Sequence, residues 1–149
     1  MAKLAELIDG RDTVIVVGPG GVGKTTTSAS IALHAARQGR KVLVLTVDPA
    51  RRLATALGLD ELGGHEARVS PAHFARAGVS LGSGALYAMM LDTKSTFDAL
   101  VQRHAPNAEA REGILQNHFY QHVSTTLAGS QEYMAMEKLY ELHEGGEFD

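Results

Sequence analysis

Eight residues near the N-terminus, from Gly18 to Thr25, carry the spacing G-x-x-x-x-G-K-[ST]. Glycines at these positions let successive backbone N–H groups curl around a phosphate, and the positive end of a following helix adds to the attraction. Lys24 supplies a charge for the β and γ phosphates of a nucleotide, and the Thr25 hydroxyl is placed to ligate magnesium. The spacing therefore predicts a P-loop that binds ATP or GTP with Mg2+. The residues expected to line it are Gly20, Gly21, Val22, Gly23, Lys24, Thr25 and Thr26.

Asp48 is the second candidate for chemistry. It follows a continuous apolar run over residues 41–47, and in doubly wound sheets ligands lie at the carboxyl ends of strands. Its carboxylate is therefore expected beside the P-loop, although an Asp-Pro pair also builds plain turns. Arg51 and Arg52 come next, where a guanidinium could contact phosphate oxygens or simply be solvated.

The elements around these residues predict a β-α-β unit. The β-branched run over residues 13–17 is expected to be a buried strand that leads into the glycine loop. An alanine-rich helix should follow from residue 25 and end before Gly39. Residues 41–47 should then form a second strand, parallel to the first and covered on both faces.

Less regular sequence follows the second strand. A short helix is expected over residues 51–57, ending at Gly58. Residues 58–85 are rich in glycine and show little periodicity, so they are expected to form a loop. Residues 86–91 are apolar and should form a third strand.

The remaining residues predict a helical region. Helices are expected over residues 93–104, 109–127 and 131–143, the last one ended by Gly145 and Gly146. Their expected N-terminal caps are Asp92 or Thr93 for the first and Ser130 for the last.

Bulk composition narrows the classes of protein. A chain of 149 residues with 44% hydrophobic residues favours one domain or part of one. Its net charge of −3 and the lack of a basic run argue against direct nucleic-acid binding. The chain has no cysteine, which excludes disulfides and cysteine zinc sites and is compatible with the cytoplasm. With no secretion signal and no bilayer-spanning run, a cytoplasmic location is expected.

These motifs resemble the ArsA-like ATPases, the arsenite-pump and tail-anchored-protein-targeting enzymes of the SIMIBI class of P-loop proteins. Residues 20–26 are similar to the deviant Walker A motif of that family, and residues 48–53 resemble its switch I segment. Residues 91–92, and then residues 128–134, resemble the PG-x-x-E helix that follows in such proteins. The resemblance covers most of the chain.

The resemblance implies roles for three residues. Asp48 would orient or activate the attacking water, Lys24 would hold the transferred phosphate, and Thr25 would bind Mg2+. It also implies ATP rather than GTP, and a homo- or heterodimer of related ATPase subunits that opens and closes around an anion or a client such as a membrane protein. Because thiol sites cannot be built without cysteine, the arsenite role is disfavoured.

One residue departs from the family pattern. The signature lysine, which reaches across the dimer to the partner's nucleotide, is expected between Gly18 and Gly20, where this chain has Pro19. Proline has neither a charge nor an N–H. Either Arg51 or Arg52 compensates, or hydrolysis is weak, or a different subunit supplies the lysine; the last interpretation is favoured.

The resemblance also sets the expected fold class: an α/β P-loop NTPase with a parallel sheet, helices on both faces and a helical insertion, incomplete on its C-terminal side. Residues 1–149 are expected to be the N-terminal portion of one ATPase domain. Within it, residues 1–92 would form the nucleotide-binding core with switch I, and residues 93–146 the helical region. Family members continue into a second switch and a base-recognition segment, to which residues 146–149 look like the lead.

Other interpretations remain open. A positioning ATPase similar to ParA or MinD would bind DNA or membrane, and a regulatory subunit would bind nucleotide with little hydrolysis. Small-molecule kinases also use P-loops, but the Asp48 segment fits an ATPase switch better. His118 and His122 have the spacing of a metal pair without an evident third ligand. The methionine-containing run from Met134 to Leu142 favours core packing over a client groove.

Overall fold

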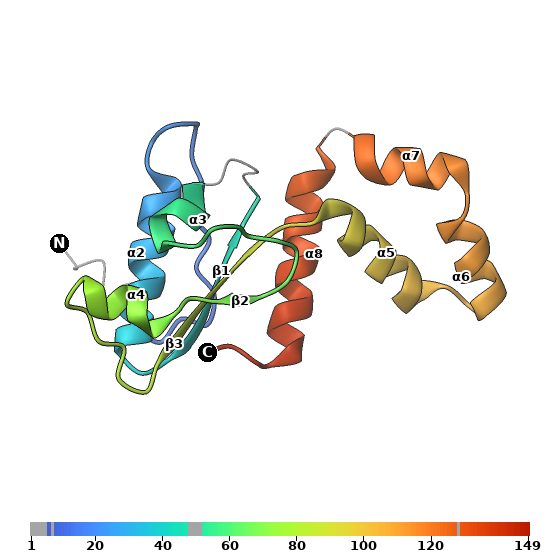
Figure 1. Ribbon diagram of the computed structural model, residues 1–149. Coiled ribbons are helices and arrows are strands. Elements are labelled where there is room, and N and C mark those ends of the chain that lie inside the picture. Colours follow the sequence, from blue (N-terminus) through green and yellow to red (C-terminus); the bar gives the residue numbers. More distant parts are fainter. Residues whose placement is uncertain (1–5, 7, 48–51, 128) are drawn as a thin grey trace.

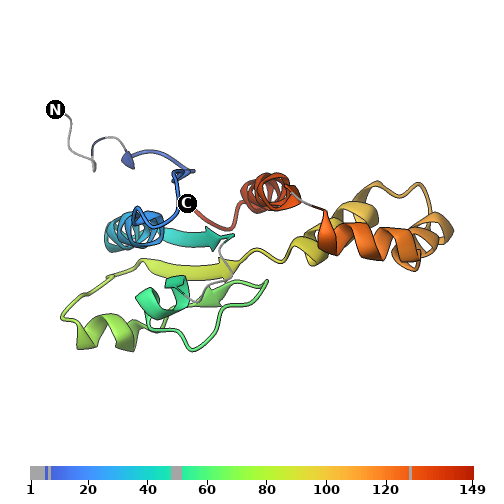
Figure 2. The same ribbon diagram turned by 90° about the horizontal axis from the view of Figure 1, so that it is seen from above.

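The computed structural model describes residues 6, 8–47, 52–127 and 129–149 (Figure 1). It combines a small sheet and its helices with a separate group of helices. The elements are α2 (Lys24–Arg37), β1 (Lys41–Thr46), α3 (Arg52–Leu57), β2 (Ala67–Arg68), α4 (Pro71–Arg76), β3 (Ala85–Met90), α5 (Thr93–His104), α6 (Ala108–Leu115), α7 (His118–Thr126) and α8 (Ser130–Gly145). In both views α8 lies between the sheet and helices α5 to α7 (Figures 1 and 2).

The described sheet has three strands in the order β1-β3-β2. β1 and β3 are parallel, with Lys41 opposite Ala85 and Thr46 opposite Met90. β2 pairs with β3 in the antiparallel sense, so the sheet is mixed and the expectation of a parallel sheet is wrong in this respect.

The stretch 58–85 is not the loop that was expected, since it contains β2 and α4. Val69 and Phe74 are buried there with 1% and 9% of their surface exposed. Ser70 caps α4 by accepting a hydrogen bond from the N–H of Ala72, and Pro71 occupies the first turn. Buried apolar side chains and a helix cap therefore organise a segment whose glycines obscured the pattern.

One apolar core joins the sheet to α2, α3 and α4. Its small residues on α2, Ala32 and Ala36, let that helix approach the strands closely. The approach is tightest at Gly84, where an added Cβ would lie 1.9 Å from the carbonyl oxygen of Ala36. The buried members of this core are Ala32, Ala36, Val44, Leu53, Leu57, Val69, Phe74, Leu81, Leu86 and Ala88.

Residues 13–17 do not form the buried strand that their β-branched sequence predicted. Val14, Ile15 and Val17 are exposed over 43%, 57% and 81% of their surface. Among the described strands none pairs with this run, and β1 is the edge strand of the sheet. A preference for extended backbone does not make a strand without a neighbour that accepts its hydrogen bonds.

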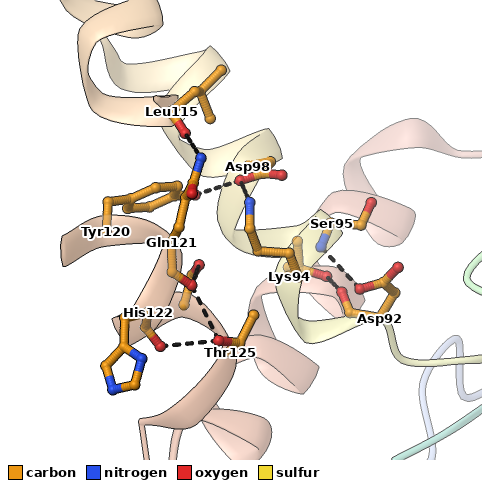
Figure 3. Close-up of polar contacts among 11 residues, drawn as sticks. Asp92, Lys94, Ser95, Asp98, Leu115, Tyr120, Gln121, His122 and Thr125 are labelled. Carbon is orange, nitrogen blue, oxygen red and sulfur yellow. Dashed lines mark hydrogen bonds and ion pairs between the residues drawn. The ribbon is translucent and has the colours of Figure 1, made fainter. Parts of the chain in front are cut away.

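The helical region begins as predicted. Asp92 caps α5, its carboxylate accepting a hydrogen bond from the N–H of Ser95 at 3.0 Å (Figure 3). The single helix expected over 109–127 is instead two helices, because the Asn117 side chain accepts hydrogen bonds from the N–H groups of Phe119 and Tyr120 at 2.8 and 3.2 Å. The Asn117 cap begins α7, and α6 ends before it at Leu115.

The last helix also differs at its start. Gly129, with φ of 79°, is the N-cap of α8, and Ser130 is the first helical residue rather than the cap. The Ser130 hydroxyl donates to the carbonyl oxygen of Leu127 at 2.7 Å, so it cannot cap the helix in the usual way. Gly146, with φ of 62°, ends α8 as the glycines predicted. None of the helices in the described part of the chain is long and apolar enough to cross a bilayer.

A polar cluster joins α5 to α7. The Tyr120 hydroxyl donates to a carboxylate oxygen of Asp98 at 2.6 Å, and Lys94 forms an ion pair with the same oxygen (Figure 3). The Lys94 ammonium also lies 5.0 Å from the centre of the Tyr120 ring. Burial raises the pKa of Tyr120, and the hydrogen bond and negative charge of Asp98 raise it further.

Candidate functional site

The glycine loop ends in two residues with left-handed backbone. Gly21 and Gly23 have φ of 81° and 88°, a region that residues with side chains rarely adopt. A Cβ added at either position would meet nothing within 4 Å, so conformation rather than crowding requires glycine there. Gly23 is the N-cap of α2, and no side chain in the described residues caps that helix. The first N–H groups of α2 therefore face the loop, as an anion site needs.

Lys24 is the first residue of α2, and its side chain folds back over the loop. Its ammonium donates to the carbonyl oxygen of Pro19 at 2.8 Å. The charge thus lies over the same loop that presents its backbone N–H groups. The acceptor role of Pro19 has no signal in the sequence, because every residue has a carbonyl and no sequence pattern marks which one is used.

The other expected site residues surround the start of α2. Thr25 is half-buried on the first turn, next to Lys24, while Thr26 is exposed. Val22 has 60% of its surface exposed in the loop, and Gly20 has open space around it. The loop, the ammonium and the Thr25 hydroxyl are therefore gathered at one end of α2.

The glycine loop lies at the same end of the molecule as the carboxyl end of β1 (Figure 1). Helix α2 contacts both β1 and α3, which follow the loop along the chain. Asp48 and Arg51 lie outside the described residues, so the roles expected for them stay predictions. Arg52 is exposed at the start of α3.

The donors at the loop fit a nucleotide and a magnesium ion. Backbone N–H groups, a helix N-terminus and an ammonium are ligands for phosphate oxygens. Within the described residues no three His, Cys, Asp or Glu side chains come together as a metal cage. Magnesium at a nucleotide does not need such a cage, because one or two protein oxygens, the phosphates and waters complete its shell. The Thr25 hydroxyl is an oxygen ligand of that kind.

The weaker candidates stay apart from this site. His118 and His122 are exposed on α7, in the helical region. Of the methionine-containing run, Met134 is buried with 1% of its surface exposed, in keeping with core packing. Met136 and Tyr140 are exposed over 54% and 55% of their surface, so the run is divided between core and surface.

Comparisons with known proteins agree with the motifs. A family model described as anion-transporting ATPase matches residues 11–149. The chain is 32% identical over 123 residues to the ATPase get3 of Aspergillus terreus, covering 82% of this chain and 33% of that protein. It is 30% identical over 131 residues to the ATPase GET3 of Malassezia globosa, covering 88% of this chain and 34% of that protein.

A shorter match is 51% identical over 47 residues to an uncharacterized protein of Streptomyces coelicolor, covering 32% of this chain and 12% of that protein. The chain spans about a third of the length of the two fungal ATPases it matches. The family model and the two fungal relatives each cover most of this chain. The chain therefore belongs to the anion-transporting ATPase family.

Proposed function

We propose that the complete protein binds ATP with Mg2+ and hydrolyses it. The observation that carries this proposal is the loop itself: two left-handed glycines lead into the uncapped start of α2, with the Lys24 ammonium held over the loop. A loop of this kind concentrates N–H groups and positive charge on one small concave surface. The family of the chain favours ATP as the nucleotide.

In this proposal each group has one task. The loop N–H groups and the N-terminus of α2 bind the phosphates, and Lys24 neutralises the charge that develops on the transferred phosphoryl group. The Thr25 hydroxyl holds Mg2+, which when bound draws charge from the β and γ phosphate oxygens. Asp48 orients the attacking water by accepting a hydrogen bond from it.

We further propose that hydrolysis switches a dimer between two states and that Pro19 makes this dimer heteromeric. Proline offers its carbonyl to Lys24 but no cation to a partner's nucleotide. A related subunit with lysine at the equivalent position would supply that cation. The switch would then couple ATP to the handling of a membrane-protein client or an anion.

A second function is favoured by the same residue. Because Pro19 removes the cation that acts across the dimer, the protein could serve as a regulatory subunit that binds ATP and leaves hydrolysis to its partner. Both candidate functions use the same loop geometry. They differ only in whether this protein itself turns over ATP.

The deciding experiment measures Mg2+-dependent ATP binding and hydrolysis by the complete protein, alone and mixed with a lysine-bearing relative. Lys24→Ala removes the loop ammonium, and Arg111→Ala on exposed α6 is the matched control for loss of one positive charge. Turnover that requires the mixture and Lys24 supports the heteromeric ATPase. ATP binding without contribution to turnover supports the regulatory subunit, and absence of ATP binding contradicts both.

A further inference from the structure

Three polar side chains converge where the N-terminal segment meets the end of α2. Asp9 lies in that segment, while His34 lies in the last turn of α2 and Gln38 is the C-cap residue of that helix. The Oδ1 atom of Asp9 lies 3.2 Å from Nε2 of Gln38 and 3.8 Å from Nε2 of His34. The two Nε2 atoms are 3.3 Å apart. Polar atoms from two separate segments thus form a small triangle.

A tight turn brings Asp9 to this place. The N–H of Arg11 donates to the carbonyl oxygen of Ile8 at 3.1 Å, which closes the turn over residues 8–11. Gly10, the third residue of the turn, has φ of 72°, a left-handed angle that glycine adopts readily. The turn therefore fixes the backbone from which the Asp9 carboxylate reaches α2.

Helix α2 supplies the other two groups from one face. His34 and Gln38 are four residues apart, which places their side chains next to each other at the end of the helix. The side chains of His34 and Asp9 are 41% and 50% exposed, and all three residues line one cavity of about 440 Å3. The C-terminal end of a helix carries a partial negative charge, which favours cations. The triangle is therefore open to solvent ions at a place that attracts positive ones.

The dimensions of the triangle match one face of a tetrahedral zinc site. Zinc with nitrogen or oxygen ligands at about 2.0–2.2 Å places neighbouring ligand atoms about 3.3–3.6 Å apart. The three distances here, 3.2, 3.3 and 3.8 Å, bracket that range. The separation of His34 from Asp9 is longer than a hydrogen bond, so these two groups are not already joined. A cation between them would contact both.

The types of ligand point to the same metal. Imidazole nitrogen and carboxylate oxygen are both ligands of Zn2+ in proteins. When Gln38 donates to His34, the Nε2 atom of His34 is unprotonated, and its lone pair is the one that a metal takes. A half-turn of the Gln38 amide brings Oε1 to the position of Nε2 and supplies an oxygen ligand. Since the third ligand is an amide, the site is compatible with the lack of a cluster of three His, Cys, Asp or Glu among the described residues.

We propose that Asp9, His34 and Gln38 bind one Zn2+ ion, with water as the fourth ligand. The ion would tie the N-terminal segment, which leads into residues 13–17 and the glycine loop, to the C-terminal end of α2. Its role is structural, because it joins two segments that are far apart in the sequence. The site lies at the opposite end of α2 from the glycine loop, so it does not depend on nucleotide binding or hydrolysis.

Zinc titration of the complete protein tests the proposal without nucleotide. Calorimetry measures the zinc affinity of the wild type, of His34→Ala and of His122→Ala, a matched control because His122 is an exposed histidine on α7. We expect His34→Ala to weaken zinc binding at least about tenfold and His122→Ala to leave it unchanged. Equal affinity in the wild type and His34→Ala, or a loss confined to His122→Ala, would overturn the proposal.

Gln38→Glu distinguishes a zinc site from a plain hydrogen-bond network. A second carboxylate attracts Zn2+ more strongly than an amide does, so zinc affinity should rise at least about tenfold. Without zinc the same change places two carboxylates side by side, so the midpoint of thermal unfolding should fall. Added zinc should then raise that midpoint by more than it does in the wild type. A Gln38→Glu variant that binds zinc no more tightly than the wild type would contradict the proposed ligand set.

Nitrogen NMR of the imidazole rings identifies the ligand atom. On addition of Zn2+ we expect the 15N resonance of His34 Nε2 to shift, because that nitrogen lies in the triangle. Mg2+ at the same concentration should leave the resonance in place, since Mg2+ prefers oxygen ligands. Zinc-dependent shifts at other histidines with none at His34 would rule out this site.

Discussion

The ammonium of Lys24 lies 2.8 Å from the carbonyl oxygen of Pro19, five residues earlier in the same loop. This contact is exposed and lies outside the apolar core, so it contributes little to folding. We expect Lys24→Ala to change the free energy of unfolding by less than about 0.5 kcal/mol. The same variant should weaken ATP binding at least tenfold, measured by calorimetry. Arg111→Ala should leave both quantities unchanged; an equal loss of affinity in that control would point to general charge rather than the loop.

Gly20 and Gly23 make a matched pair in the loop. An added Cβ has open space at both, but only Gly23 has a positive φ. Gly23→Ala should therefore destabilise the protein by about 1–2 kcal/mol through backbone strain. Gly20→Ala should lower the free energy of unfolding by much less. Urea unfolding of the two variants measures the difference, and similar losses would show that the left-handed conformation is not what requires Gly23.

Gly84 is required for a different reason. Its added Cβ would lie 1.9 Å from the Ala36 carbonyl oxygen, and neither backbone group can move away cheaply inside the core. We expect Gly84→Ala to destabilise the protein by more than about 2 kcal/mol. Gly63→Ala is the control, because its added Cβ meets nothing within 4 Å. Thermal or urea unfolding distinguishes them, and a mild effect at Gly84 would mean that α2 and β3 are less tightly packed.

Asn117 separates α6 from α7 by capping the second helix. Asn117→Ala removes the side-chain oxygen that accepts hydrogen bonds from the N–H groups of Phe119 and Tyr120. This change should lower the free energy of unfolding by about 1 kcal/mol. Asn117→Asp keeps an acceptor at the same place and should retain most of the stability. If the alanine variant were as stable as the aspartate variant, the break between the helices would have another cause.

The Tyr120–Asp98 contact predicts a pH dependence. Burial and Asp98 raise the pKa of Tyr120 above the usual value near 10, so the folded protein holds this proton more tightly than the unfolded chain. The stability that the contact provides is fully present below that usual value and is lost as pH rises through the folded pKa. Urea midpoints should therefore fall above about pH 10. Tyr120→Phe should make this fall shallower; an unchanged slope would assign it to other groups.

Local signals in the sequence predicted much of the fold. The alanine-rich helix, two apolar strands and the Asp92 cap lie close to the expected positions because each depends on neighbours within a few residues. The strand expected at 13–17 depends on a distant partner, which no local pattern encodes. Asn117 was overlooked for a related reason, since helical periodicity continues on both sides of the break.

The candidate site was predictable to a similar degree. The spacing of Gly18, Gly23 and Lys24 identified the loop, because phosphate recognition by backbone N–H groups needs glycine at set positions. The left-handed backbone angles at Gly21 and Gly23 are ones that glycine adopts readily, in keeping with that requirement. The contact of Lys24 with the Pro19 carbonyl was not predictable, since it depends on a side-chain rotamer.

The edge of β1 and the exposed run 13–17 have a consequence for association between copies of this chain. Val14, Ile15 and Val17 are exposed beside an edge of β1 on which no other described strand lies, a combination that recruits other extended chains. We therefore expect a polypeptide of residues 1–149 alone to aggregate more readily as its concentration rises.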